Sequence, residues 1–371
     1  MNVRSLLKER TSNMRHEKIN NLLELEQATL PWFVNEYIHS KSLVPYSTVT
    51  LYEYAKEYRR FFEWLQEESI TSSVQSVTLE DLDRLRKEDL ELYKSHLMHS
   101  PKNGTSTDNR SRSFVTVQRT LTALRSLFNY LSTQTEDENN QTYLKHNVML
   151  KIENVRATTT LQERSRAIEK KLLLDDEAIL FLYYIDQDYE GTLKSHQAIA
   201  AFRRNKIRDL AIIALFLGTG MRLSELVNMQ VSDLDTVNLE ATVIRKGGFK
   251  DTALISSLFI DYIIDYQESR IALYQPEASQ KALFLTTFKG KAKQIEPSTV
   301  EKLVAKYSTA FKVRITPHKL RHTVGTQLYK KTNSLLTVSH QLGQTGTSAT
   351  SIYTHIVDKE QRNAMNDLWS E

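Results

Sequence analysis

The chain has no cysteine, which excludes disulfide bonds and thiolate metal sites and makes a reducing cytoplasm its natural setting. Proline and glycine are scarce, at 6 and 10 of 371 residues, and this favours long helices over hairpins. The longest apolar run, residues 210–217, is far shorter than the roughly 20 residues that a bilayer span needs. The first residues also lack the apolar core of a signal peptide. We therefore expect a helical protein of the cytoplasm, with no membrane contact.

What the chain does have is 40% hydrophobic residues, enough to bury a large core in two domains. Its net charge of +4 permits an acidic partner such as nucleic acid without demanding one. Residues 1–27 are typical of a charged helical lead-in. Residues 28–156 hold four amphipathic segments with helical spacing, which predicts a small four-helix bundle. Basic residues on these helices suit either a phosphate backbone or an ordinary solvated surface.

Residues 157–172 are polar and charge-rich, and we place the interdomain linker there. The second domain, residues 173–371, is predicted to be mostly helical. Its one strand region, residues 241–255, alternates and then turns at a glycine pair, which predicts an antiparallel hairpin with Lys246 at its tip.

One stretch near the end of the chain concentrates chemical side chains. Thr316 and Pro317 predict a helix start, after which His318 and Arg321 lie one turn apart and can both contact one anion. Further on, a helix is expected to end at Gly343, and a short new helix presents Tyr353.

A second arginine follows a glycine turn earlier in the chain. Arg222 is predicted in the first turn of a new helix, where its planar fork and free backbone N–H groups suit a phosphate. The competing interpretation is a surface ion pair with Glu225.

Neither a metal nor a cofactor is expected. His318 and His322 are four residues apart, but Lys319 stands where a zinc-protease helix requires glutamate. The glycine turn before Arg222 lacks the third glycine of a dinucleotide fingerprint.

Taken together, these are the parts needed to move a phosphodiester without metal or ATP. Two guanidinium groups can neutralise the charge that builds on the non-bridging oxygens. A tyrosine can attack the phosphorus when a base or positive charge assists it, with His318 as base and Lys246 as acid.

The chain also resembles the tyrosine recombinases of the phage integrase family, over nearly its whole length. The similarity is to the Xer type, in the branch where one protein does the work usually divided between two paralogues. It is carried by residues 51–65, 208–215, 245–248, 316–323 and 353–357.

This resemblance implies a fold and a set of roles. The fold is mainly α, with an N-terminal four-helix (SAM-like) core-binding domain and a mostly helical catalytic domain that has a small antiparallel β-sheet. Arg222 and Arg321 become the phosphate clamp and Tyr353 the nucleophile that forms a 3′-phosphotyrosyl bond. His318 becomes the base or proton relay, and Lys246 the acid for the 5′ oxygen.

Two further positions bear on the site. Lys250 takes the place of Lys246 as the acid if the register of the hairpin is shifted. Gln344 stands where the family usually has histidine or tryptophan, and its amide can still donate to a phosphate oxygen, so slower chemistry is expected. His340 lies one turn earlier and could partly replace the missing histidine. The favoured interpretation is that it is an ordinary core or surface histidine.

The implied partners are double-stranded DNA at a specific site, a homotetramer around a Holliday junction, and a septal DNA translocase. Residues 359–371 are expected to form a helix that docks on a neighbouring subunit, or alternatively caps its own domain. Three functions remain open: chromosome-dimer resolution before cell division, integration or excision of a mobile element, and DNA binding with weakened catalysis. A type IB topoisomerase would share the chemistry, but the bundle and the docking tail favour recombination.

Overall fold

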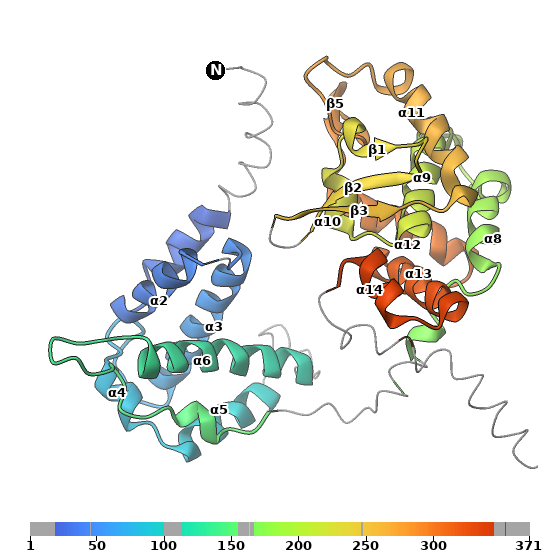
Figure 1. Ribbon diagram of the computed structural model, residues 1–371. Helices are drawn as coiled ribbons and strands as arrows, with labels where there is room; N and C mark the ends of the chain where they lie inside the picture. The colour runs from blue at the N-terminus through green and yellow to red at the C-terminus, as the bar shows by residue number, and fades with distance from the viewer. Residues whose placement is uncertain are drawn as a thin grey trace, which may run out of the picture. The chain divides into compact units, whose positions relative to one another are not determined.

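The computed structural model describes residues 19–44, 46–99, 113–154, 163, 167–245, 248–344 and 353. The chain divides into two compact units, Met1–Thr158 and Thr159–Glu371 (Figure 1). Most of the predicted linker lies outside the described residues, so its bounds stay a prediction.

The first unit is a bundle of helices around an aromatic core. Its elements are α2 (Trp32–Ser42), α3 (Thr48–Glu67), α4 (Leu79–Arg84), α5 (Lys87–His99), α6 (Phe114–Thr133) and the 3₁₀ turn η1 (Val148–Lys151). The hydroxyls of Ser47 and Ser113 accept backbone N–H groups at the starts of α3 and α6, as good N-caps do. Phe61 on α3 and Phe128 on α6 are fully buried, with ring centroids 6.4 Å apart. The predicted helical bundle is confirmed.

Several basic side chains of this bundle pair with its own carboxylates. Ion pairs join Lys56 and Arg119 to Glu53, Arg60 to Glu57, and Arg59 to both Glu26 and Glu63. Ion pairs at a surface contribute little stability and exchange readily for other partners. These cations therefore lie on a surface of mixed charge.

The second unit is built around one long buried helix, α9 (His196–Thr219), against which α8, α11, α12 and α13 pack. Its other helices are α8 (Glu177–Tyr183), α10 (Leu223–Asn228), α11 (Ile260–Tyr274), α12 (Pro297–Phe311), α13 (Pro317–Thr332) and α14 (Leu335–Leu342). Short turns complete it at η2 (Tyr184–Asp188), η3 (Tyr189–Thr192), η4 (Val231–Asp233) and η5 (Ser257–Phe259).

Two small antiparallel sheets complete the unit, and the predicted mainly helical fold with a small sheet is confirmed. The strands are β1 (Leu234–Asp235), β2 (Glu240–Ile244), β3 (Lys250–Leu254), β4 (Leu285–Phe288) and β5 (Lys291–Gln294). They pair in the orders β1-β2-β3 and β4-β5. Ile244 faces Lys250 across the predicted hairpin, and Lys246 lies outside the described residues.

A tight turn after α9 sets up the candidate site. Gly220 caps α9 in the left-handed region, with φ of 69°, where a side chain is strained. A Cβ on this glycine would lie 2.6 Å from Leu342 on α14, so the turn and α14 approach as closely as glycine allows. The chain then enters α10 directly, which places Arg222 beside α13 and α14.

In the described part of the chain, no helix combines the length and the apolar character that crossing a membrane requires.

Candidate active site

Arg321 lies on α13 with its guanidinium buried at the end of α14. Its Nη1 donates to the carbonyl of Gly220 at 2.9 Å and its Nη2 donates to the carbonyl of Leu342. Burial, followed by the nearby charge of Arg222, lowers the pKa of Arg321 to about 10. The group therefore stays charged at neutral pH, and two bonds fix its orientation.

Arg222 is the N-cap residue of α10 and not, as predicted, part of its first turn. The backbone N–H of Arg222 donates to Glu225 at 2.7 Å, and its Nη1 donates to the other carboxylate oxygen at 2.7 Å. The Nη2 of Arg222 donates to the carbonyl of Gly343 at 3.0 Å. The ion pair of the competing interpretation exists, but Glu225 is buried, so the pair is no surface contact. Instead, it aims the arginine at the end of α14.

The two arginines therefore bind successive carbonyl groups, those of Leu342 and Gly343. These carbonyls end α14, where a helix leaves acceptors unsatisfied and carries a partial negative charge. Gly343 caps the helix in the left-handed region with φ of 56°, as predicted from its sequence. The guanidinium groups are consequently neighbours.

Sequence reasoning missed Arg245, the residue that follows β2. Its side chain is 8% exposed and donates to Asp251, Glu225 and the carbonyl of Gln341. Alternation along β2 carried a signal for this burial, because Ala241 and Val243 point into the core and Arg245 continues their period of two. A charge placed there needs a buried partner.

Tyr353 lies in a closed apolar pocket made by α13 and α14. It is fully buried with Val338 and Leu342, and a Cβ on Gly325 would lie 2.6 Å from its ring. Its hydroxyl lies close to Gln344, but neither this hydroxyl nor Oε1 of Gln344 has a hydrogen-bond partner among the described residues. Burial raises the pKa of Tyr353 against the opposing charge of Arg321. The phenol is therefore neutral here.

The two histidines of α13 pack against each other, and His322 also contacts this tyrosine. The ring of His322 is 4.5 Å from that of His318 and 5.7 Å from that of Tyr353, centroid to centroid. Desolvation and the charge of Arg321 lower the pKa of His318. Desolvation and His318 lower the pKa of His322 to about 3. His318 is exposed at the helix start, where an incoming anion would meet it, and at neutral pH it is able to accept a proton.

The remaining predicted residues fall in different places. Lys246 lies outside the described residues, whereas Lys250 is exposed at the start of β3. Gln344 follows α14, where its backbone N–H donates to the carbonyl of Ser339 and its carbonyl accepts from the hydroxyl of Ser339. His340 is exposed on the opposite side of α14 from Tyr353, where it lines a separate groove. The described residues contain no group of three histidine or carboxylate side chains placed as metal ligands.

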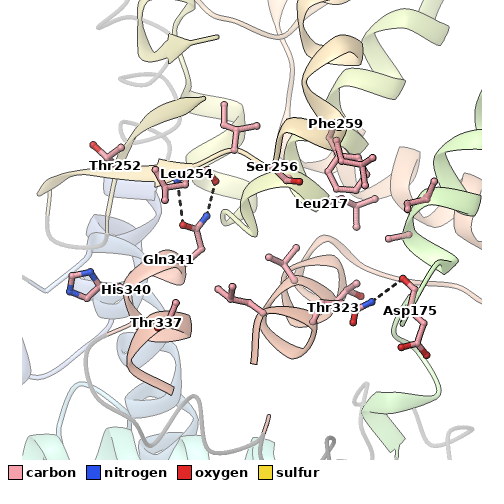
Figure 2. Close-up of a pocket in the computed structure, with 18 of the residues that line it drawn as sticks. Asp175, Leu217, Thr252, Leu254, Ser256, Phe259, Thr323, Thr337, His340 and Gln341 are labelled. Carbon is pink, nitrogen blue, oxygen red and sulfur yellow. Dashed lines mark hydrogen bonds between the residues drawn. The ribbon is translucent and has the colours of Figure 1, made fainter. Parts of the chain in front are cut away.

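That groove, about 830 Å³ in volume, lies between α8, the end of α9, β3, α13 and α14 (Figure 2). Gln341 closes one wall, because its amide exchanges hydrogen bonds with the backbone of Leu254 (Figure 2). The lining is mostly apolar and includes side chains that are more than 40% exposed: Ile179, Leu254, Leu258 and Leu336.

The contact of Tyr353 with Gly325 predicts that Gly325→Ala changes the free energy of unfolding in opposite directions with and without the tyrosine. Gly325→Ala should lower the free energy of unfolding of the parent by about 1–2 kcal/mol, because the new methyl group overlaps the tyrosine ring. In a Tyr353→Ala background the same change should raise it by about 0.5–1 kcal/mol, since alanine favours a helix over glycine. Denaturant unfolding of the four proteins measures both values; the same sign in both backgrounds would place the tyrosine elsewhere.

Comparisons with known proteins show the family of this chain. Residues 192–360 match the phage integrase family. The chain is 43% identical to a tyrosine recombinase XerS of Streptococcus pyogenes serotype M28 (strain MGAS6180) and 44% identical to one of Streptococcus gordonii (strain Challis), in each case over 96% of this chain and 100% of the relative. Among solved structures, the XerH site-specific recombinase bound to palindromic difH substrate in a post-cleavage complex matches with a TM-score of 0.62 at 21% identity, covering 87% of this chain and 80% of that one. The chain belongs to the phage integrase family, the tyrosine recombinases.

Proposed function

We propose that this recombinase cuts and rejoins duplex DNA through Tyr353, with Arg222 and Arg321 as the clamp on the scissile phosphate. The observation that carries the proposal is that both guanidinium groups bind adjacent carbonyls at the end of α14. Each arginine has five N–H donors and uses only two of its side-chain donors in the contacts described above. The remaining donors are suited to the two non-bridging oxygens of one phosphate.

The other roles follow from the chemistry of an in-line displacement. Tyr353 attacks the phosphorus and loses its proton, and His318 is the base or relay for that proton. Lys246 protonates the 5′ oxygen as it leaves. A 3′-phosphotyrosyl bond forms, and a 5′ hydroxyl of the partner strand later attacks it. The amide of Gln344 donates to the same phosphate.

The burial of Tyr353 keeps this nucleophile unreactive until it is released. Tyr353 is buried and neutral, with a raised pKa, so attack requires the ring to leave its pocket and its hydroxyl to approach the arginine pair. The positive charge of Arg321 then favours the phenolate.

The biological role we propose is resolution of chromosome dimers at a terminus site, in the cytoplasm, with a septal DNA translocase as activator. Support comes from the relatives that share 43–44% identity over their full length and carry the name XerS.

The chemistry is tested by covalent trapping. The parent should form an adduct with a tightly bound duplex that is nicked so that it cannot religate, as read on a denaturing gel. Tyr353→Phe should abolish the adduct, and Tyr329→Phe, a change at the partly buried tyrosine beside it, should not. Gln344→His should raise the yield severalfold if the amide is the weaker donor. An adduct in Tyr353→Phe would sink the proposal; firm binding without any adduct would favour a DNA-binding module.

We further propose that the chain works as a homotetramer in which residues 359–371 of one subunit fill the groove of the next. In that segment Ala364, Met365, Leu368 and Trp369 recur at helical spacing, which gives one apolar face. The segment lies outside the described residues. A groove with exposed apolar side chains is typical of a binding site for the apolar face of a helix.

This docking would bear on the nucleophile. Leu328 of α13 lines the groove and also packs against the cluster that contains Tyr353. A neighbour's tail would therefore contact the helices that hold the tyrosine, which links assembly to activity.

Docking between subunits predicts complementation. Leu368→Lys in the tail and Leu336→Lys in the groove should each prevent assembly on DNA, and Leu336 is 71% exposed, so its change should not disturb folding. Mixing the two variants should restore dimers, since one partner keeps an intact groove and the other an intact tail. Ile271→Lys, at a 70% exposed position of α11 away from the groove, is the control. Mass by light scattering is the readout; no recovery on mixing would mean that the tail binds its own subunit.

A further inference from the structure

We infer that Arg245 is a positioning residue that fixes the root of the Lys246 hairpin against the arginine clamp. The inference rests on the proposed role of Lys246 as the acid for the leaving oxygen. The guanidinium of Arg245 makes three hydrogen bonds, and each of them reaches a different part of the site.

The first bonds tie the hairpin to the carboxylate that aims Arg222. Nη1 of Arg245 donates to Oε2 of Glu225 at 3.1 Å, while Oε1 of the same carboxylate accepts from Arg222. Nε donates to Asp251 on β3 at 2.8 Å, across the hairpin from Arg245. The hydrogen bond from Arg245, helped by its positive charge, lowers the pKa of Asp251 and holds the carboxylate ionised.

The third bond ties the hairpin to α14. Nη2 of Arg245 donates to the carbonyl of Gln341 at 3.2 Å, one residue before the carbonyl that binds Arg321. A Cβ on Gly343 would lie 2.2 Å from Nε of Arg245, so the guanidinium rests directly on the glycine. The end of α14 and the hairpin are therefore held together by one side chain.

The backbone of Arg245 is equally constrained. Its N–H donates to the carbonyl of Phe249 at 2.8 Å, and its carbonyl accepts from the N–H of Gly248 at 3.0 Å. Lys246 is the next residue, so the chain leaves a fixed point when it enters the segment that carries the acid.

Only arginine supplies this geometry. Its rigid fork donates in three directions at once, whereas a lysine ammonium on a flexible stem would leave the buried Glu225 or the Gln341 carbonyl short of a partner. With 8% exposure and these bonds made, Arg245 is not placed to bind the phosphate itself.

The charges of the site agree with this division of roles. Arg222, Arg245 and Arg321 carry three positive charges, and Glu225 and Asp251 carry two negative ones. This set is left with one positive charge, which the single negative charge of a phosphodiester would neutralise.

The test separates positioning of the acid from general support of the site. In the ordinary substrate the Tyr353 Oη–P bond forms, the P–O5′ bond breaks, and O5′ takes a proton from Lys246. When sulfur replaces the 5′ bridging oxygen, a thiolate leaves, and with a thiol pKa of about 8.5 it needs no proton. Arg245→Met, which keeps about the aliphatic part of the side chain, should cleave the oxygen substrate at least about tenfold more slowly than the parent, which is a part of the roughly 10²–10⁴-fold that a general acid contributes. With the sulfur substrate it should cleave at close to the parental rate.

Two controls make each outcome decisive. Arg270→Met removes another buried arginine of the same unit, whose hydrogen bonds within the described part of the chain go to the carbonyls of Leu283, Gln280 and Ala282, and should leave the ratio of the two rates unchanged. Lys246→Ala should show the same rescue by sulfur as Arg245→Met. If Lys246→Ala is rescued and Arg245→Met is slow on both substrates, Arg245 is merely structural and the inference is overturned, while the proposed function stands. If Lys246→Ala is not rescued, the proposed acid is wrong and the inference fails with it.

Asp251→Asn covers the case in which Arg245→Met does not fold. Asp251 is 44% exposed, so the change is tolerated, and it weakens the bond to Nε without removing the guanidinium. A smaller loss, again confined to the oxygen substrate, is expected; equal losses on both substrates would contradict the inference.

Discussion

The buried carboxylate of Glu225 is the interaction on which the rest of the site depends. Its two oxygens bind Arg222 and Arg245, and its charge also favours the protonated form of Arg321. Without it, three guanidinium groups would repel one another in a poorly solvated space, where an uncompensated charge is costly. Because Glu225 caps α10 as well, the tight turn at Gly220 and the placement of Arg222 form one arrangement. The price is a site that tolerates little change at this residue.

The end of α14 is the second organising element, because its last carbonyls meet all three arginines. The carbonyls of Gln341, Leu342 and Gly343 accept from Arg245, Arg321 and Arg222 in turn. One side of α14 lines the apolar groove, and the buried side chains on its other side pack against Tyr353. A displacement of α14 would therefore reach the clamp, the nucleophile and the groove together. This connection gives a physical route from subunit contacts to chemistry.

Much of this fold was predictable, because local signals agree with the tertiary structure. Thr316 and Pro317 start α13 and Gly343 ends α14, as capping rules require, although the hydroxyl of Thr316 makes no cap bond. The burial of Arg245 and the contact of Gly325 with the tyrosine were not predicted, since each depends on segments distant in sequence. Arg222 was placed one residue too far into α10. An N-cap residue is usually small and polar, whereas here the N-cap is an arginine whose backbone N–H is bound by the carboxylate of Glu225. The groove is lined by six elements, α8, α9, β3, η5, α13 and α14, and no single stretch of sequence indicates it.

The most direct test of this account is a structure of Tyr353→Phe bound to the duplex on which the parent forms its adduct. In that structure Arg222 and Arg321 should donate to the two non-bridging oxygens of one phosphate, with Glu225 still bound to Arg222 and Arg245. A phosphate held by other residues, or an arginine pair that stays on the α14 carbonyls away from the DNA, would contradict it.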